Sequence, residues 1–143
     1  MLRNTPIKEI MSTKLITVKV DEAFSHVEEK LRLHHIRHLP VVDNNNKLVG
    51  IITERDLYKA VSPRETEDGF YYDKTQLDSF ILKHFMTPNP LTLQPENTVQ
   101  EVVSLMAAHK YGCIPIAASD KTLLGIVTQI DILRFVAKWF NQT

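Results

Sequence analysis

One short stretch occurs twice in the chain and decides how the rest is interpreted: Gly50-Ile51-Ile52-Thr53-Glu54-Arg55-Asp56 returns as Gly125-Ile126-Val127-Thr128-Gln129-Ile130-Asp131. Both copies consist of Gly, two apolar residues, Thr, two variable residues and Asp. Aliphatic, β-branched residues followed by Thr and Asp predict a strand that runs directly into the first turn of a helix. The stretch therefore predicts the same strand–helix junction at two places in the molecule.

The repetition extends far beyond this stretch. Positions 7–61 align without a gap with positions 82–136, and 12 of the 55 aligned pairs are identical. Most of the remaining pairs match apolar with apolar residues, as two copies of one structural unit would. We therefore expect a first repeat at 7–61, a connector at 62–81, a second repeat at 82–136 and the end of a C-terminal helix at 137–143.

Each repeat is expected to fold as β-α-β-β-α. An extended stretch at 15–18, or at 90–93 in the second copy, precedes a helix. We expect Asp21 to cap this helix in the first copy, and a capping box starting at Thr98 to cap it in the second. Two strands then flank a turn rich in Asn, Asp and Ser, and a second helix begins at the repeated junction.

The predicted fold class is α/β, of the α+β kind. A unit of about 50 residues buries too little surface to be stable alone, so we expect two copies packed by pseudo-twofold symmetry around a shared core. Pro40 and Pro115 each remove a hydrogen-bond donor from a strand. They are therefore expected at a strand start or at a sheet edge.

The composition excludes several classes of protein. Among the 143 residues, 43% are hydrophobic and 24% are charged, with 17 Lys and Arg against 17 Asp and Glu. The zero formal charge argues against binding of nucleic acid polymers. The apolar runs are far shorter than the ~20 residues of a membrane helix, and the N-terminus has no signal-peptide pattern. A single cysteine, Cys113, excludes an internal disulfide, and a cytoplasmic protein is the simplest expectation.

The repeated junction has the chemistry of an anion site. The first N–H groups of a helix lack partners and carry partial positive charge, which suits a phosphate. The Thr hydroxyl can donate to a phosphate oxygen, and the Asp carboxylate can accept from ribose hydroxyls. The preceding glycine permits close approach of another backbone. Thr followed three residues later by Asp also resembles a helix-capping box, but its presence in both copies favours ligand binding.

Other candidate sites are weaker. His34 and His38 are four residues apart, as helical zinc ligands can be, and His35 lies between them. No Glu occupies the place that a metalloprotease needs, and Pro40 predicts that the helix ends before His38. Cys113 has no second Cys and no Cys-His-Asn arrangement, so a small apolar residue is favoured over a nucleophile. No catalytic pattern is found, and an enzyme is not expected.

Two segments each allow two interpretations. The connector contains Phe70-Tyr71-Tyr72 among five acidic residues. A solvated connector with aromatic residues on its surface is favoured over a flap near a ligand or a dimer contact. The C-terminal helix has apolar residues at helical spacing from Phe135 to Phe140. It packs on the core, or it forms a surface for self-association.

Together, the motifs resemble a tandem pair of cystathionine β-synthase (CBS) domains, the Bateman module. The residues that carry the resemblance are Ile10-Met11-Ser12, His35 to Asp43 and Gly50 to Asp56 in the first copy, and Phe85-Met86-Thr87-Pro88, Cys113-Ile114-Pro115-Ile116 and Gly125 to Asp131 in the second. The resemblance implies a module that binds AMP, ADP, ATP or S-adenosylmethionine in a cleft between the repeats. It also implies a homodimer that regulates another protein and requires no cofactor.

The resemblance assigns roles to individual residues. Thr53 and Thr128 would contact phosphate or ribose, and Asp56 and Asp131 would bind ribose hydroxyls. Thr17 and Thr92 would face the adenine. The residues just before the Pro-containing strand would line the pockets: Ile36, Arg37 and His38 in one copy, and Tyr111, Gly112 and Cys113 in the other.

The two sites are expected to be unequal. Arg37, His38 and Arg55 bring cationic partners to the presumed phosphates in the first copy, where the second has Gly112, Cys113 and Ile130. Two functions remain in view: an adenine-nucleotide sensor, and a protein-interaction or assembly module with vestigial clefts. A DNA-binding regulator comes third because the net charge is zero.

Overall fold

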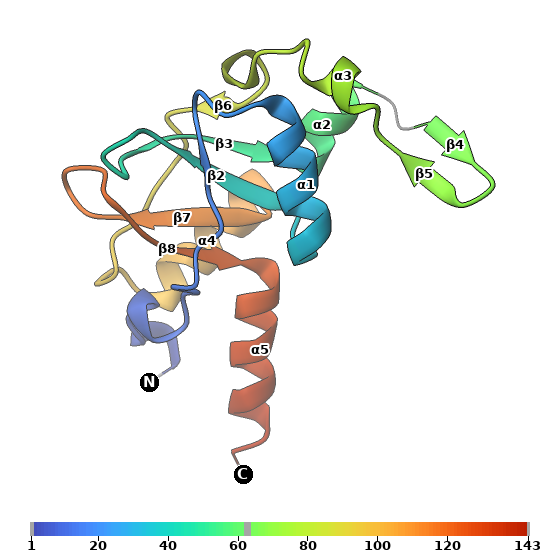
Figure 1. Ribbon diagram of the computed structural model, residues 1–143. Coiled ribbons are helices and arrows are strands. Elements are labelled where there is room, and N and C mark those ends of the chain that lie inside the picture. Colours follow the sequence, from blue (N-terminus) through green and yellow to red (C-terminus); the bar gives the residue numbers. More distant parts are fainter. Residues whose placement is uncertain (1, 62–63, 143) are drawn as a thin grey trace. The chain divides into compact units, whose positions relative to one another are not determined.

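The computed structural model describes residues 2–61 and 64–142 (Figure 1). The chain forms two compact units. The central unit is the segment Ile16–Asn89, and the terminal unit combines Met1–Leu15 with Pro90–Thr143. Helices and strands occur in both units, as the predicted α+β class requires.

The central unit is built on a four-stranded sheet in the order β1-β2-β3-β6. These strands are β1 (Val18–Lys19), β2 (His38–Val42), β3 (Leu48–Thr53) and β6 (Thr87–Pro88). β1 is parallel to β2, whereas β3 is antiparallel to both of its neighbours. The helices are α1 (Phe24–His34), α2 (Glu54–Ala60) and α3 (Lys74–Leu77), followed by a 3-10 turn at Leu82–His84. A separate hairpin of β4 (Arg64–Thr66) and β5 (Gly69–Tyr71) lies between α2 and α3 in the chain.

The terminal unit repeats this plan. After 3-10 turns at Leu2–Asn4 and Ile7–Glu9, it contains α4 (Val99–His109), β7 (Cys113–Ala117), β8 (Leu123–Thr128) and α5 (Gln129–Phe140). β7 and β8 are antiparallel, with a register irregularity that corresponds to one between β2 and β3. A parallel bridge from Leu93 to Ile116 and an antiparallel bridge from Ser12 to Ile126 correspond to the pairings of β1 and β6. The predicted repeat of secondary structure is thus present.

The segment before each repeat's first strand pairs with the strands of the other repeat. In the terminal unit, Ser12 and Ile126 exchange backbone hydrogen bonds of 2.9 and 3.0 Å. In the central unit, Thr87 and Pro88 of β6 pair with Ile51 and Gly50 of β3. The compact units therefore divide the chain at different points from the sequence repeats.

These exchanged segments explain the glycine in each repeated stretch. A Cβ atom added to Gly50 would lie 2.5 Å from the Met86 sulfur and 3.0 Å from the Thr87 carbonyl oxygen. At Gly125 the same atom would lie 2.8 Å from the Met11 sulfur and 3.0 Å from the Ser12 carbonyl oxygen. The expectation that the glycine permits close approach of another backbone is confirmed, and that backbone belongs to the exchanged segment.

Each unit has its own hydrophobic cluster, and each cluster combines residues of both sequence repeats, such as Ile7 in the terminal unit and Leu82 in the central unit. The terminal cluster is centred on Ile7, Val102, Ile114, Ile116 and Val127. The central cluster contains Phe24, Leu39 and Ile52, and it extends into the expected connector through Leu77 and Phe80. Part of the connector is therefore core, although a solvated segment was favoured. Residues 62–63 lie outside the described part of the chain.

The cap predicted for the first helix is wrong. α1 begins after Ala23, not Asp21, and the backbone N–H of Ser25 donates to a carboxylate oxygen of Asp78 at 2.9 Å. A residue from the expected connector thus supplies the cap that the local sequence lacks. The Thr98 cap is present, since its hydroxyl accepts from the Glu101 N–H at 3.2 Å. The reciprocal bond is replaced, because the Glu101 carboxylate accepts from the Asn97 amide at 2.6 Å.

Neither proline starts its strand, but β7 is paired with β8 alone in its sheet, so the alternative expectation of a sheet edge holds for Pro115. Pro40 lies in β2 between β1 and β3, where neither expectation holds. Pro40 is the third of five residues in β2, and Pro115 is the third of five in β7. The ladder between β1 and β2 begins one residue later, with Val18 opposite Val41. Since the parallel neighbour has not yet begun to pair there, the missing N–H breaks no bond of that ladder.

Candidate functional site

The repeated junction forms a complete capping box in both units. The Thr53 hydroxyl accepts from the Asp56 N–H at 3.2 Å, and Asp56 Oδ2 accepts from the Thr53 N–H at 2.9 Å. The corresponding distances for Thr128 and Asp131 are 3.3 and 2.8 Å. Thr and Asp stop the strand and start the helix together, and capping of this kind contributes about 1 kcal/mol.

The capping box leaves one acceptor unused in each junction. The Thr hydroxyl donates to Asp Oδ2 at 3.1 Å in both copies, so its proton is already engaged. In the described residues, Oδ1 of Asp56 and of Asp131 accepts no hydrogen bond. Capping and ligand binding are therefore compatible: Oδ2 holds the helix start, and Oδ1 remains available for a hydroxyl donor.

The residues before each Pro-containing strand lie beside the junction of their own unit. The Arg37 carbonyl accepts from the Glu54 N–H at 3.0 Å, and the Gly112 carbonyl accepts from the Gln129 N–H at 3.2 Å. His38 is the register partner of Thr53, and Cys113 is the partner of Thr128. The first N–H of each helix is consequently occupied by the protein's own backbone.

A third strand, β1, begins at the same edge of the sheet. β1 is parallel to β2 and β2 is antiparallel to β3, so β1 and β2 begin where β3 ends. Thr17 immediately precedes β1, and its carbonyl accepts from Lys30 Nζ at 2.6 Å. Thr92 has the matching place before Leu93, whose N–H donates to the Pro115 carbonyl. Each unit therefore gathers its predicted site residues at one edge of its strands.

The electrostatics of the two edges differ. In the central unit, Arg37 and Arg55 are exposed and form no ion pair with the described residues. Burial, and then the charge of Arg37, lower the pKa of His38. In the terminal unit, the corresponding edge is uncharged apart from Asp131.

Two further predicted site residues lie at the terminal edge, Cys113 and Tyr111. Cys113 is buried, and burial raises its thiol pKa to about 12, as befits a core residue and not a nucleophile. The Tyr111 ring stacks on His109 with centroids 5.2 Å apart. The partial positive charge at a helix N-terminus, which would attract a phosphate, is weaker for α2 than for α5, because α2 has 7 residues and α5 has 12.

The central unit contains a cavity of about 490 Å³ that sequence reasoning did not find. α1, α2 and the segment around β5 line it on its closed sides and leave it open to solvent, and its polar lining residues are Glu28, Arg32, Glu54, Tyr58, Tyr71 and Tyr72. The available signal was the pair Tyr71-Tyr72, for which the interpretation as a flap near a ligand was set aside.

In the described ranges, no group of three or more His, Cys, Asp and Glu side chains is placed to hold a metal ion. None of the helices in these ranges has the length and apolar character needed to cross a membrane.

Two α+β units with the same capped strand–helix junction define a tandem repeat module. The chain belongs to the CBS domain family, whose model matches residues 7–63 and 82–138. A CBS domain-containing protein of Dictyostelium discoideum is 33% identical over 136 residues, which are 92% of this chain and 91% of that protein. An inosine-5′-monophosphate dehydrogenase of Korarchaeum cryptofilum is 35% identical over 118 residues, which are 82% of this chain and 21% of the enzyme.

Solved structures support the same fold. The CBS domain pair of protein MJ0100, in complex with 5′-methylthioadenosine and S-adenosyl-L-methionine, matches with a TM-score of 0.75 and 30% identity, over 92% of this chain and 99% of that one. CBSX2 from Arabidopsis thaliana matches with a TM-score of 0.80, over 98% of this chain and 99% of that one. Its 23% identity supports the fold alone.

Proposed function

We propose that this chain is a regulatory module that binds an adenosine-containing ligand and signals its presence to a partner protein. The candidates are AMP, ADP, ATP and S-adenosylmethionine. The CBS pair is a regulatory module in members of the family, and the related pair of MJ0100 holds two adenosine compounds. The observation that carries the proposal is the unused Oδ1 of Asp56 and Asp131, repeated at the same sheet edge in both units.

The geometry suggests how such a ligand would be held. Oδ1 of each Asp accepts a hydrogen bond from a ribose hydroxyl, while Oδ2 continues to cap the helix. The segment at Thr17, or at Thr92, lies across the sheet edge and takes the adenine. Because the same carboxylate fixes the helix start, ribose binding constrains the junction between strand and helix. That constraint is the change that α2 or α5 conveys.

The two junctions should differ in their response to phosphate. Arg37 and Arg55 supply cations at the central edge, and Gly112 and Ile130 stand in their places at the terminal edge. A guanidinium strengthens contacts to phosphate oxygens. We expect AMP, ADP and ATP to favour the central unit and phosphate-free adenosine compounds to discriminate less.

Calorimetric titration with AMP, ADP, ATP and S-adenosylmethionine tests the proposal on the parent and on Asp56→Asn and Asp131→Asn. Asn keeps one oxygen to cap the helix and replaces the unused oxygen with an NH₂ donor, so the fold is retained while the ribose acceptor is lost. Loss of a hydrogen bond to a charged group weakens binding by about 10- to 100-fold. Asp73→Asn is the matched control, because Asp73 caps α3 through the Thr75 N–H at 2.9 Å.

The control should bind as the parent does, and at least one of the two junction variants should lose affinity. If no ligand binds to the folded parent, or if both junction variants bind like Asp73→Asn, the sensor function is wrong.

α5 supports a second function, self-association. None of its residues is buried, and Leu133, Trp139 and Phe140 are 62, 47 and 64% exposed. Large apolar side chains are enriched in the centres of interfaces, and we propose a homodimer that uses this helix. Analytical ultracentrifugation should find a dimer for the parent and for Arg134→Gln, and a monomer for Leu133→Gln. A parent that stays monomeric at every concentration, or a dimer unaffected by Leu133→Gln, contradicts the proposal.

A further inference from the structure

We propose that the central unit contains a second ligand site, which takes an organic cation of the alkylammonium or guanidinium type. The site is the cavity between α1, α2 and β5, with Tyr58, Tyr71 and Tyr72 as its aromatic walls and Glu54 as its counter-charge. Its volume of about 490 Å³ is in the range of small-molecule pockets, ~300–1,000 Å³.

Three tyrosines around one cavity present several π-faces to a ligand. The rings of Tyr58 and Tyr72 are tilted by 57° with centroids 6.2 Å apart. Tyr58 and Tyr71 are 52 and 47% exposed, so their rings are open to a ligand. The face of an aromatic ring attracts a cation within about 6 Å of its centre, and tilted rings contact one from more than one side.

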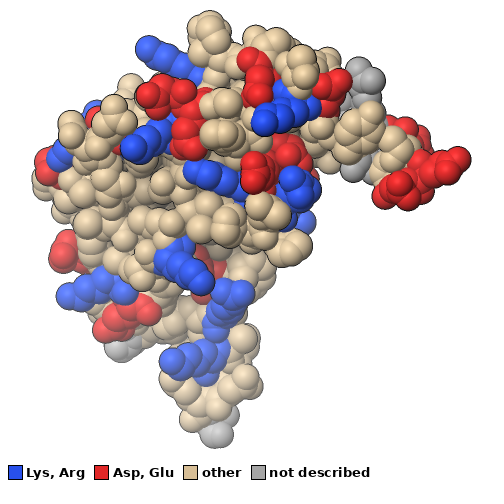
Figure 2. Space-filling model, in the orientation of Figure 1, with Lys and Arg blue, Asp and Glu red and all other residues tan. Residues whose placement is uncertain are grey.

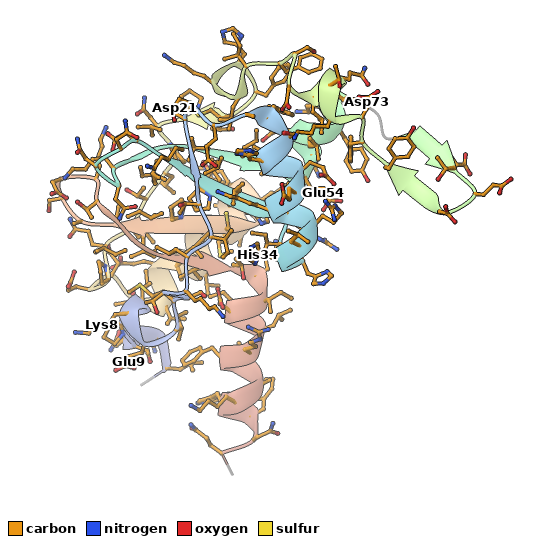
Figure 3. The ribbon with its side chains drawn as sticks, in the orientation of Figure 1. Lys8, Glu9, Asp21, His34, Glu54 and Asp73 are labelled. Atoms are coloured by element: carbon orange, nitrogen blue, oxygen red, sulfur yellow. The ribbon has the colours of Figure 1, made fainter. Side chains whose placement is uncertain are left out.

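The charges around the cavity select a cation over an anion. Glu28 is already paired with Arg32 at 2.8 Å, whereas the Glu54 carboxylate, on the labelled side chain of Figure 3, has no ion pair in the described ranges. The lining therefore retains one negative charge. Burial raises the pKa of the Tyr72 hydroxyl, and the nearby Tyr58, Glu54 and Glu28 raise it further, as expected where the potential is negative.

One polar atom of the lining, the Tyr72 hydroxyl oxygen, lacks a well-placed hydrogen-bond partner. The Tyr72 hydroxyl oxygen is shielded from solvent, and its one side-chain neighbour able to hydrogen-bond, Tyr58, does not meet it with normal hydrogen-bond geometry in the described residues. A buried hydroxyl without a well-placed partner lowers the stability of the folded state, so a ligand that supplies one is favoured. An N–H or O–H group of the ligand would supply a donor to this oxygen, in addition to the contacts of its cationic group with the rings.

The hairpin that leads into the cavity extends the negative potential. Glu65, Glu67 and Asp68 are exposed at or near its turn, and Figure 2 shows acidic side chains gathered at the outer end of this hairpin. β5 continues directly from this turn to Tyr71 and Tyr72. Such a field attracts cations and repels phosphates, so the cavity is chemically distinct from the junction proposed for adenosine ligands.

Different residues at and near the start of α2 belong to the two sites. Thr53 and Asp56 form the capping box, whereas Glu54 and Tyr58 line the cavity. Substitutions at Glu54 and Tyr71 therefore test the cation site without removing any group assigned to the ribose. Failure of this proposal is distinguishable from failure of the sensor function.

The experiment is a titration of the ¹⁵N-labelled full chain, followed by NMR. The probes are choline, its neutral carbon isostere 3,3-dimethylbutan-1-ol, and the peptide Gly-Lys-Gly amide. We expect choline to shift the resonances of Tyr58, Tyr71 and Tyr72, and the neutral alcohol to bind at least about tenfold more weakly, because only the cation gains from π-faces and the carboxylate. Binding by the lysine peptide but not choline would identify the cation's source as a partner's side chain.

Two variants test the assignment of residues. Glu54→Gln and Tyr71→Leu should each weaken binding by about 3- to 30-fold. Glu65→Gln removes an acidic group that does not line the cavity. It should change the affinity by less than Glu54→Gln or Tyr71→Leu does. Tyr71 is exposed, so its substitution leaves the core intact, and circular dichroism checks the fold of each variant. Equal binding of choline and the neutral alcohol overturns the proposal, as does no binding by any probe or parent-like affinity in both variants.

Discussion

Replacing Gly125 with Ala should destabilise the terminal unit, although alanine is the better residue in most strands. The added Cβ would lie 2.8 Å from the Met11 sulfur and 3.0 Å from the Ser12 carbonyl oxygen, closer than the ordinary contact range of 3.4–4 Å. The Met11 side chain can rotate away. The Ser12 carbonyl cannot, because it accepts from the Ile126 N–H at 3.0 Å while the Ser12 N–H donates back at 2.9 Å.

The magnitude follows from that pair of bonds. Moving Ser12 outward by a few tenths of an ångström stretches both, and each contributes about 0.5–1.5 kcal/mol. Overpacking of this kind costs about 1–3 kcal/mol, and the lower entropy of alanine in the unfolded chain offsets about 0.5–1 kcal/mol. We expect the free energy of unfolding to fall by about 1–2 kcal/mol, and Tm to fall by about 3–8 °C.

Urea unfolding, followed by far-UV circular dichroism and Trp139 fluorescence, measures this loss. Met11→Ala provides a second background, in which the sulfur contact is gone and the carbonyl contact remains. Gly125→Ala should still destabilise the chain in that background, by less than in the parent. If Gly125→Ala unfolds at the same urea concentration as the parent, the close approach of the exchanged segment does not require glycine and the reasoning is refuted.

Three further substitutions test other features. Asp78→Ala removes the acceptor for the Ser25 N–H and should lower the free energy of unfolding by about 1 kcal/mol; no loss in urea unfolding would mean that water caps α1 equally well. Leu77→Ala should cost about 2–5 kcal/mol by the same measurement, because Leu77 is 1% exposed; a cost below 1 kcal/mol would return the segment to a solvated connector. The pKa of His38 is lower folded than unfolded, so the unfolded chain binds the proton first, and stability should fall as pH drops below about 6.5. Between pH 7.5 and 5, Tm should therefore decrease less in His38→Gln than in the parent. An equal decrease in both proteins would mean that other groups cause the loss of stability.

The sequence predicted most reliably what is local and duplicated. Thr53 and Thr128 start their helices because Thr and Asp, three residues apart, satisfy backbone groups within one turn. The role of glycine in the strand was predictable too, since only glycine lacks the atom that a close backbone would meet. Whether the box also serves a ligand could not be decided from residue types, because the question depends on which carboxylate oxygen is used.

The errors came from contacts between distant parts of the chain. Asp21 was the nearest residue able to cap α1, but Asp78 does so from the far end of the connector. Alignment of the repeats shows which positions are equivalent and says nothing about which segment pairs with which strand, so the exchange of Met11-Ser12 and Met86-Thr87 was not visible. The cavity was missed because α1, α2 and β5 contribute its tyrosines and glutamates separately.

The exchanged segments determine the order in which parts of the chain can fold during synthesis. The central unit, Ile16–Asn89, is continuous and can fold once that stretch has left the ribosome, as N-terminal domains generally do. Residues 1–15 are made before it, yet the strand that Ser12 joins is translated more than a hundred residues later. Until then Ile7, which is fully buried in the finished unit, is exposed to water and to chaperones. A segment translated before the central unit is therefore among the last to be packed.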